Sequence, residues 1–233
     1  MTAAALAFWG GTQLFESSLA PASCRWCEPG ALDSAVRGAL RWNDTAAANT
    51  ASNVGAYALV PLTSLGLLAA GAHGEGRFGE MAGNVLVIAE SVALAESANQ
   101  IVKFAVGRER PFVHALPPAG KSSTDNPADN NVSFYSAHTS FAFALAVSTG
   151  TVASLRRYRW APAIWAAGLA GAAAVGYLRI AADRHYFTDV VTGAVAGGAF
   201  GLVVPYEFHR APAALTLVPA PGGGVMLALS ARL

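Results

Sequence analysis

Three short clusters of charged and polar residues stand out in a chain that is otherwise strongly apolar. In chain order they contain Lys103 and Arg110, then Ser136 and His138, then Arg179, His185 and Asp189. Together they offer three cations, two imidazoles, a hydroxyl and a carboxylate. Such a set is typical of a site for a phosphate-like oxyanion.

The three cations suit the binding of a phosphate dianion. Arginine presents a planar fork that matches two phosphate oxygens, and lysine adds a point charge. The backbone amides at the start of a helix supply further donors. We therefore expect Lys103, Arg110 and Arg179 to neutralise the dianion and the additional charge of its transition state.

The two histidines suit the transfer of a phosphoryl group. An imidazole can attack phosphorus if a carboxylate fixes its tautomer and stabilises the cation that forms. His185 and Asp189 are four residues apart, so a helix would place them on one face. A second imidazole, His138, is then available to protonate the leaving oxygen.

Long uncharged segments surround these clusters and predict the elements that hold them. Only 12% of the residues are charged, and the charges leave gaps close to the roughly 20 residues that span a bilayer. The uncharged runs are residues 54–72, 139–155, 160–178 and 190–205, and a fifth apolar segment, 82–102, contains Glu90 and Glu96. None alternates apolar and polar residues with a period of two, which argues against strands.

The prediction is an all-α bundle of about five to six transmembrane helices around a phosphate site. We expect its core at residues 54–210, after a leader at 1–53 and before a tail at 211–233. The polar part of the leader, residues 24–53, is expected to face solvent. Two short apolar segments around a Gly-rich turn in that tail predict a β-hairpin. A soluble bundle of Ala-rich helices is the alternative.

A basic turn at residues 155–160 predicts the topology. It joins two uncharged runs and carries three arginines, and cationic loops of membrane proteins tend to stay in the cytoplasm. Alternation of the helices then places residues 103–136 and 179–185 together on the opposite face. Each polar cluster alone fits snorkelling cations, a helix cap or a surface ion pair, but their common side favours a single site.

The order and spacing of the clusters resemble the three-part signature of the type 2 phosphatidic acid phosphatase and vanadium haloperoxidase superfamily. The chain has Lys-x6-Arg-Pro from Lys103, Ser-x-His from Ser136, and Arg-x5-His-x3-Asp from Arg179. These motifs span residues 103–189, and the apolar segments around them resemble the membrane-embedded branch. Three motifs with their internal spacing intact are far more specific than any one of them.

The resemblance implies a role for each matched residue. The phosphoryl oxygens would be held by Lys103, Arg110, Arg179, Ser136 and the amides near Ala137 and His138. His185 would become a transient phosphohistidine oriented by Asp189, and His138 would act as general acid and later as base for water. The resemblance also implies no metal and no other cofactor for the phosphatase members, and a site at the outer face of the membrane.

The chain departs from the usual family pattern at three positions. Tyr135 stands where the family commonly has proline. Ala137 stands where the family commonly has glycine, so the local backbone must accept a Cβ atom. Leu178 stands where a serine often precedes the arginine, which removes one hydroxyl. None of the three changes deletes a charged or catalytic group, so we expect activity to be retained. Arg108, Asp183 and Arg184, beside the motifs, fit surface pairing at least as well as tuning of the site charge.

The composition excludes several other classes of function. A formal net charge of +1 disfavours nucleic-acid binding. Cys24 and Cys27 form one C-x-x-C without the further ligands of a zinc site, so a local disulfide or two ordinary thiols are expected. The apolar residues 1–15 fit an anchor, an interfacial helix or the remnant of a signal peptide.

The leading hypothesis is a membrane phosphatase for a lipid phosphate monoester or diphosphate, such as a phosphatidate or an isoprenoid diphosphate. Small Ala-rich helices and the cysteine pair favour a bacterial inner membrane with the site facing the periplasm. The alternatives are a vanadate-dependent haloperoxidase, a phosphotransferase, and a membrane transporter or structural protein. All the lipids considered present the same reacting group, so the sequence predicts the group and not the lipid.

Overall fold

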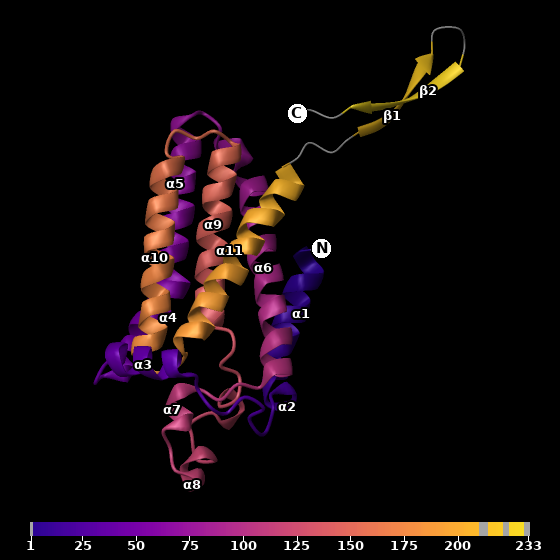
Figure 1. Ribbon diagram of the computed structural model, residues 1–233. Helices are drawn as coiled ribbons and strands as arrows, with labels where there is room; N and C mark the ends of the chain where they lie inside the picture. Colours follow the sequence, from indigo (N-terminus) through magenta and orange to yellow (C-terminus); the bar gives the residue numbers. More distant parts are fainter. Residues whose placement is uncertain (1, 210–213, 221–223, 231–233) are drawn as a thin grey trace.

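The computed structural model describes residues 2–209, 214–220 and 224–230 and consists mainly of a bundle of helices (Figure 1). Its long helical segments are α4 (Thr45–Val54), η1 (Gly55–Leu59), α5 (Val60–Gly74), α6 (Met81–Val106), α9 (Ala137–Leu155), α10 (Ala161–Ala181) and α11 (Phe187–His209). The first three run on as one helix, in which η1 is a single π-helical turn. The predicted all-α class is thereby confirmed.

The described residues contain more helices than the five or six predicted, because the leader and the polar loop also fold. Their short helices are α1 (Thr2–Leu14), α2 (Glu16–Leu19), α3 (Ala31–Leu40), η2 (Phe78–Glu80), α7 (Pro111–His114), α8 (Pro118–Lys121) and η3 (Pro127–Asp129). Proline opens α7, α8 and η3, where its fixed φ suits a first helical turn and its missing N–H costs nothing.

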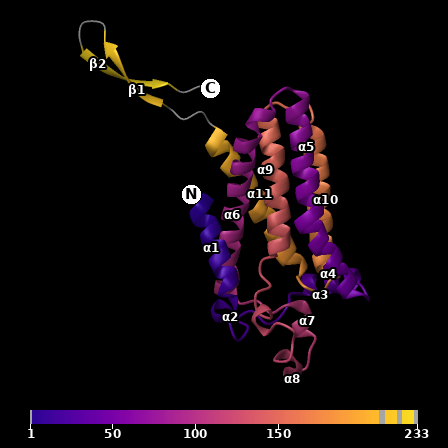
Figure 2. The ribbon, with the colours of Figure 1, turned by 180° about the vertical axis from the view of Figure 1, so that it is seen from behind.

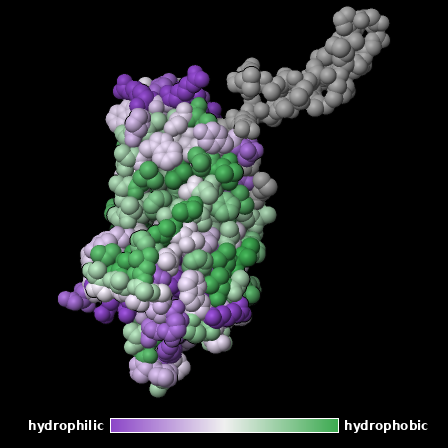
Figure 3. Space-filling view, viewed as in Figure 1, coloured by the Kyte–Doolittle hydropathy of each residue, from purple (hydrophilic) through white to green (hydrophobic). Residues whose placement is uncertain are grey.

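Four helical segments are long and apolar enough to cross a membrane. They are Thr45–Gly74, Phe78–Val106, Ala161–Ala181 and Phe187–Glu207. The remaining predicted run, residues 139–155, forms α9, which lies in the centre of the bundle against α5, α6, α10 and α11 (Figures 1 and 2). Figure 3 shows apolar residues over the middle of the bundle and hydrophilic residues gathered near its ends, as expected for a membrane protein.

Glycines in α11 bring its backbone close to that of α9. A Cβ atom at Gly193 would lie 2.7 Å from the carbonyl oxygen of Ser136, and one at Gly201 would lie 2.7 Å from that of Ala144. Small residues of this kind permit close helix approach in lipid. As a result the start of α11 touches the start of α9, where the N–H of Ser136 donates to the carbonyl of Asp189 at 3.1 Å.

The three polar clusters meet at one end of the bundle. Helices α6 and α10 end there, and α9 and α11 begin there, at the lower end in Figure 1. The basic turn between α9 and α10 lies at the opposite end. This arrangement matches the predicted separation of the basic turn from the polar clusters.

The structure of the two cysteines and of the tail also agrees with what the sequence predicts. Cys24 and Cys27 form a disulfide, one of the two states predicted for them. Strands β1 (Ala214–Ala220) and β2 (Gly224–Ser230) pair antiparallel, with Ala214 opposite Ser230. They occupy the place of the predicted hairpin, and its turn at residues 221–223 lies outside the described residues.

Candidate active site

A polar cavity of about 280 Å³ opens at the lower end of the bundle. Its walls contain, among others, the predicted residues Lys103, Arg110, Ala137, His138, Arg179 and His185. The sequence therefore identified residues from three helices (α6, α9 and α10) and two loops that the fold brings to a single place. The remaining predicted residues, Ser136 and Asp189, lie immediately behind its wall.

The start of α9 supplies backbone donors to this cavity. Ser136 is the N-cap, and its hydroxyl oxygen accepts hydrogen bonds from the N–H of Thr139 at 3.4 Å and from the Thr139 hydroxyl at 2.9 Å. The Ser136 oxygen thus caps the helix, and its own O–H remains as a donor. The N–H groups of Ala137 and His138 belong to the first helical turn, which has no carbonyl partner within the helix. Both residues line the cavity, so this helix end presents amides to an anion.

Ala137 fits this geometry without strain. It is the first residue of α9, and the non-glycine residues with positive φ among those described are Arg157 and Asp183. The backbone at Ala137 is therefore one that any L-residue adopts. The departure from the family's usual glycine leaves the amide donor in place.

The cations of the cavity are held by different kinds of partner. Arg179 donates to the side-chain oxygens of Asn49 at 2.8 Å and Ser52 at 2.9 Å, which are neutral. Arg110 instead pairs with Asp129, whose carboxylate and carbonyl both accept from its guanidinium. Burial opposes ionisation of Asp129, yet the charges of Arg110 and Lys103 hold the pKa of that carboxyl below its usual value.

Lys103 is the cation with the fewest partners. It is buried at the end of α6, and within the described residues no carboxylate lies within ion-pair distance of its ammonium group. A buried charge without a counter-ion is costly. Its presence in the wall of the cavity favours an anionic ligand as the missing partner.

His185 has one tautomer defined by its surroundings. Nδ1 lies 2.8 Å from the carbonyl oxygen of Ser133, which can only accept, so Nδ1 carries the proton. Nε2 then accepts from Arg110 Nη1 at 3.2 Å, and its lone pair points into the cation cluster. Burial, together with the charges of Arg110, Arg179 and Lys103, holds the pKa of this imidazole well below its ordinary value. His185 is therefore neutral at pH 7.

His138 faces the same cavity from the first turn of α9. Its Nε2 lies 2.8 Å from the side-chain oxygen of Asn53, and its ring packs 4.9 Å from that of Tyr57, measured between centroids. The two predicted imidazoles thus reach one cavity from different elements. A phosphoryl group between them would contact one ring on each side.

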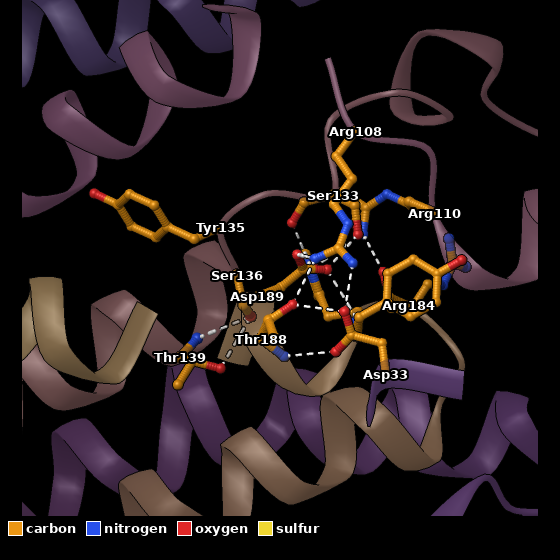
Figure 4. Close-up of polar contacts among 12 residues, drawn as sticks. Asp33, Arg108, Arg110, Ser133, Tyr135, Ser136, Thr139, Arg184, Thr188 and Asp189 are labelled. Carbon is orange, nitrogen blue, oxygen red and sulfur yellow. Dashed lines mark hydrogen bonds and ion pairs between the residues drawn. The ribbon is translucent and has the colours of Figure 1, made fainter. Parts of the chain in front are cut away.

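Asp189 lies behind His185 and is not its closest hydrogen-bond partner. Its carboxylate is 3.7 Å from Nδ1 of His185. It accepts from the Ser133 hydroxyl at 2.6 Å and from the N–H of Tyr186 at 2.9 Å, and it forms an ion pair with Arg108 (Figure 4). The imidazole is therefore oriented directly by the Ser133 carbonyl, and Asp189 is a nearby negative charge.

Several residues of the cavity were not singled out from the sequence. Asn49, Asn53 and Tyr57 come from the long helix that begins at Thr45, and Asp129 comes from the polar loop. The spacing of Asn49 and Asn53, four residues apart on one helical face, was a signal that could have pointed to them. Their segment was predicted to face solvent, whereas α4 continues into the bundle and turns these amides toward the site.

Arg108 also differs from expectation. The sequence predicted surface pairing for it at least as much as tuning of the site charge, yet it is 1% exposed and ion-paired with Asp33 and Asp189. Trp26 and Tyr186 stack on its guanidinium, with its carbon 3.8 Å and 4.4 Å from the ring centroids. The sequence could not show this because Asp33 and Trp26 lie more than 70 residues away.

In the described residues, no group of three or more His, Cys, Asp or Glu side chains could hold a metal ion.

Comparison with known proteins supports the three-motif resemblance. No curated protein and no solved structure matches the chain. A family model described as the PAP2 superfamily matches residues 84–212, more than half of the sequence and all three motifs. On this match, the chain belongs to the PAP2 superfamily, which indicates phosphatase activity on phosphate esters.

Proposed function

We propose that the chain hydrolyses the phosphate monoester or diphosphate group of a lipid through a phosphohistidine at His185. The observation that carries the proposal is the tautomer of His185 and the direction of its free lone pair. Its Nδ1 is held by the Ser133 carbonyl, and the Nε2 lone pair faces a cavity lined by Lys103, Arg110 and Arg179. A neutral imidazole aimed at a cluster of cations is suited to attack a bound phosphoryl group.

In the first step, the Nε2 lone pair of His185 forms a bond to phosphorus, and the bond from phosphorus to the leaving oxygen breaks. The electron pair of that bond stays on the leaving oxygen, which takes a proton from the imidazolium form of His138. Burial and the cations of the cavity lower the pKa of His138, and the bound phosphate dianion offsets those charges and favours the protonated ring. The imidazole of His185 keeps its Nδ1 proton and becomes a cation. Lys103, Arg110, Arg179 and the amides at the start of α9 stabilise the charge on the phosphoryl oxygens.

In the second step, His138 has lost its proton and accepts one from a water molecule. The water oxygen bonds to phosphorus, the bond from phosphorus to Nε2 breaks, and its electron pair returns to Nε2. Inorganic phosphate and the original form of His185 result. Asn53, 2.8 Å from Nε2 of His138, keeps that ring turned toward the reacting group.

The surroundings of the cavity support a lipid substrate at a membrane surface. Four apolar helical segments are long enough to span a bilayer, and the cavity opens at one end of the bundle. The Cys24–Cys27 disulfide lies at that same end, where the N–H of Arg25 donates to the Gly107 carbonyl at 2.8 Å. Disulfides persist in oxidising compartments, so we place the site on the periplasmic face of a bacterial inner membrane.

The test is release of inorganic phosphate by the detergent-purified chain from phosphatidate, an isoprenoid diphosphate and a short-chain phosphate ester, without added metal. The parent is expected to release phosphate, and the variants His185→Ala and His138→Ala are expected to lose it. His73→Ala is the matched control, because this exposed histidine lies at the opposite end of the bundle.

Trapping of the enzyme during turnover should give an acid-labile phosphoryl group in the parent and none in His185→Ala. Phosphate release that survives His185→Ala would overturn the phosphohistidine mechanism. Release from the short ester without release from either lipid would overturn the lipid assignment.

A further inference from the structure

A buried cluster of three charges lies directly behind His185. Arg108 pairs with Asp189 through Nη1 and with Asp33 through Nη2 at 2.6 Å, and all three side chains are nearly inaccessible (Figure 4). Thr188 joins the cluster, because its N–H and hydroxyl donate to Asp33 at 2.9 Å and 2.8 Å. None of its members takes part in the two steps described above.

Asp33 comes from a part of the chain that the family match does not cover. It lies in α3, whereas the matched residues begin at 84. Its carboxylate is 2% exposed and reaches the start of α11. Burying a carboxylate is costly unless it is paired, so its position beside an already paired arginine requires a reason.

The charges of the cluster suggest that reason. The charges of Asp189 and Arg108 alone would cancel, and a pair without net charge would stabilise a nearby cation only weakly. With Asp33 included, the cluster of two carboxylates and one guanidinium carries a net charge of −1. Asp189 is 3.7 Å from Nδ1 of His185, so this excess charge stands next to the ring that becomes positive when it is phosphorylated.

The packing of Arg108 keeps this arrangement fixed. Trp26 and Tyr186 cover its guanidinium, and Trp26 lies in the short loop that the Cys24–Cys27 disulfide closes. The backbone on either side is also pinned, since the N–H of Glu109 donates to the Trp26 carbonyl at 3.1 Å. Arg108 can therefore not turn away to bind phosphate, and it remains the bridge between the two carboxylates.

We infer that Asp33 is a positioning residue whose charge offsets Arg108 and leaves Asp189 free to stabilise the imidazolium of phosphorylated His185. The inference deepens the proposed function and depends on it. It concerns the step in which Nε2 bonds to phosphorus, the leaving group departs with its electron pair, and the ring gains positive charge. Substrate binding, which the cations of the cavity provide, should not involve Asp33.

The first test is Asp33→Asn, which removes the charge and nearly preserves the shape. We expect kcat on the short-chain ester to fall about 10- to 100-fold, with KM changed less than about twofold. Asp183→Asn is the matched control, since Asp183 is also buried but pairs with Arg37 and Arg41 outside the cluster. It should lower thermal stability similarly and leave kcat near that of the parent.

Two further variants separate charge from packing. Asp33→Glu keeps the charge and should retain kcat within about threefold of the parent. The double variant Asp33→Asn with Arg108→Gln leaves Asp189 as the only charge, so its net charge is again −1. We expect the double variant to exceed Asp33→Asn in kcat, whereas independent losses of packing would multiply.

The inference is overturned if folded Asp33→Asn keeps its kcat, or if the double variant is slower than the single one. A loss of kcat above tenfold in Asp33→Glu would also overturn it, and this outcome can be measured even if Asp33→Asn does not fold. A parent that releases no phosphate would instead contradict the proposed function itself.

Discussion

The two ends of the bundle both gather arginines, but they use them in different ways. At the end with the basic turn, Arg77 and Arg156 pair with Glu80 at 2.9 Å and 3.4 Å, and all three side chains are partly exposed. At the end with the cavity, Lys103 and Arg179 are buried, and the partners of Arg179 are an amide and a hydroxyl.

The difference lies in whether the positive charge that no carboxylate neutralises is exposed to solvent or buried. Glu80 pairs with Arg77 and Arg156, and Arg157 and Arg159 are exposed to solvent, so the arginines at this end serve topology and local stability. Neutral partners orient Arg179 without cancelling its charge, and among the described residues no carboxylate lies within ion-pair distance of Lys103. The charge of these two side chains remains available to a dianion, so the partners distinguish a binding site from a structural turn.

Removal of the Lys103 charge is expected to have the largest effect on activity, because this charge belongs to the binding end of the bundle. In Lys103→Met the volume is kept and the charge is lost, so kcat/KM should fall about 100- to 1000-fold. Thermal stability should stay the same or rise, because a buried charge without a counter-ion is costly. Phosphate release and thermal unfolding of the same preparations measure both effects. A loss of activity explained by unfolding would contradict the idea that this charge is reserved for the ligand.

The residues inside the three motifs could be predicted from the sequence, and those brought in from segments before residue 54 could not. Lys103, His138 and Asp189 lie at fixed spacings within motifs, and the uncharged runs predicted which helix ends would meet. Asp33 and Asn49 depend on how residues before 54 fold back onto the bundle. That contact is tertiary, and local polarity alone predicted a solvent-facing segment.

The uneven distribution of charge also predicts a dependence of stability on pH. The pKa of His185 lies well below its ordinary value, so in phosphate-free buffer the folded chain keeps this ring neutral while the unfolded chain takes up a proton below about pH 6.5. The unfolded state then binds more protons, and stability falls as the pH is lowered through that range. Above it, both states are neutral and the contribution vanishes.

Denaturant unfolding of the parent and of His185→Gln between pH 5 and 8 measures this effect. The parent should lose up to about 1 kcal/mol per pH unit more than the variant below pH 6.5. Phosphate in the buffer should reduce the difference, because a bound anion favours the protonated ring. Equal slopes for the two proteins would show that the cations do not act on His185.

The smallest effect is expected at the basic turn. Arg77→Gln removes a partly exposed ion pair with Glu80 and a hydrogen bond of 2.6 Å to the carbonyl of Arg156. Such pairs contribute about 0.2 to 1 kcal/mol, so the midpoint of unfolding should fall slightly and kcat/KM should not change. Because Glu80 retains Arg156 as a partner, no buried charge is left alone. If this substitution lowered kcat/KM as Lys103→Met does, the arginines of the two ends would be coupled through the bundle, and the separation of a structural end from a catalytic end would be wrong.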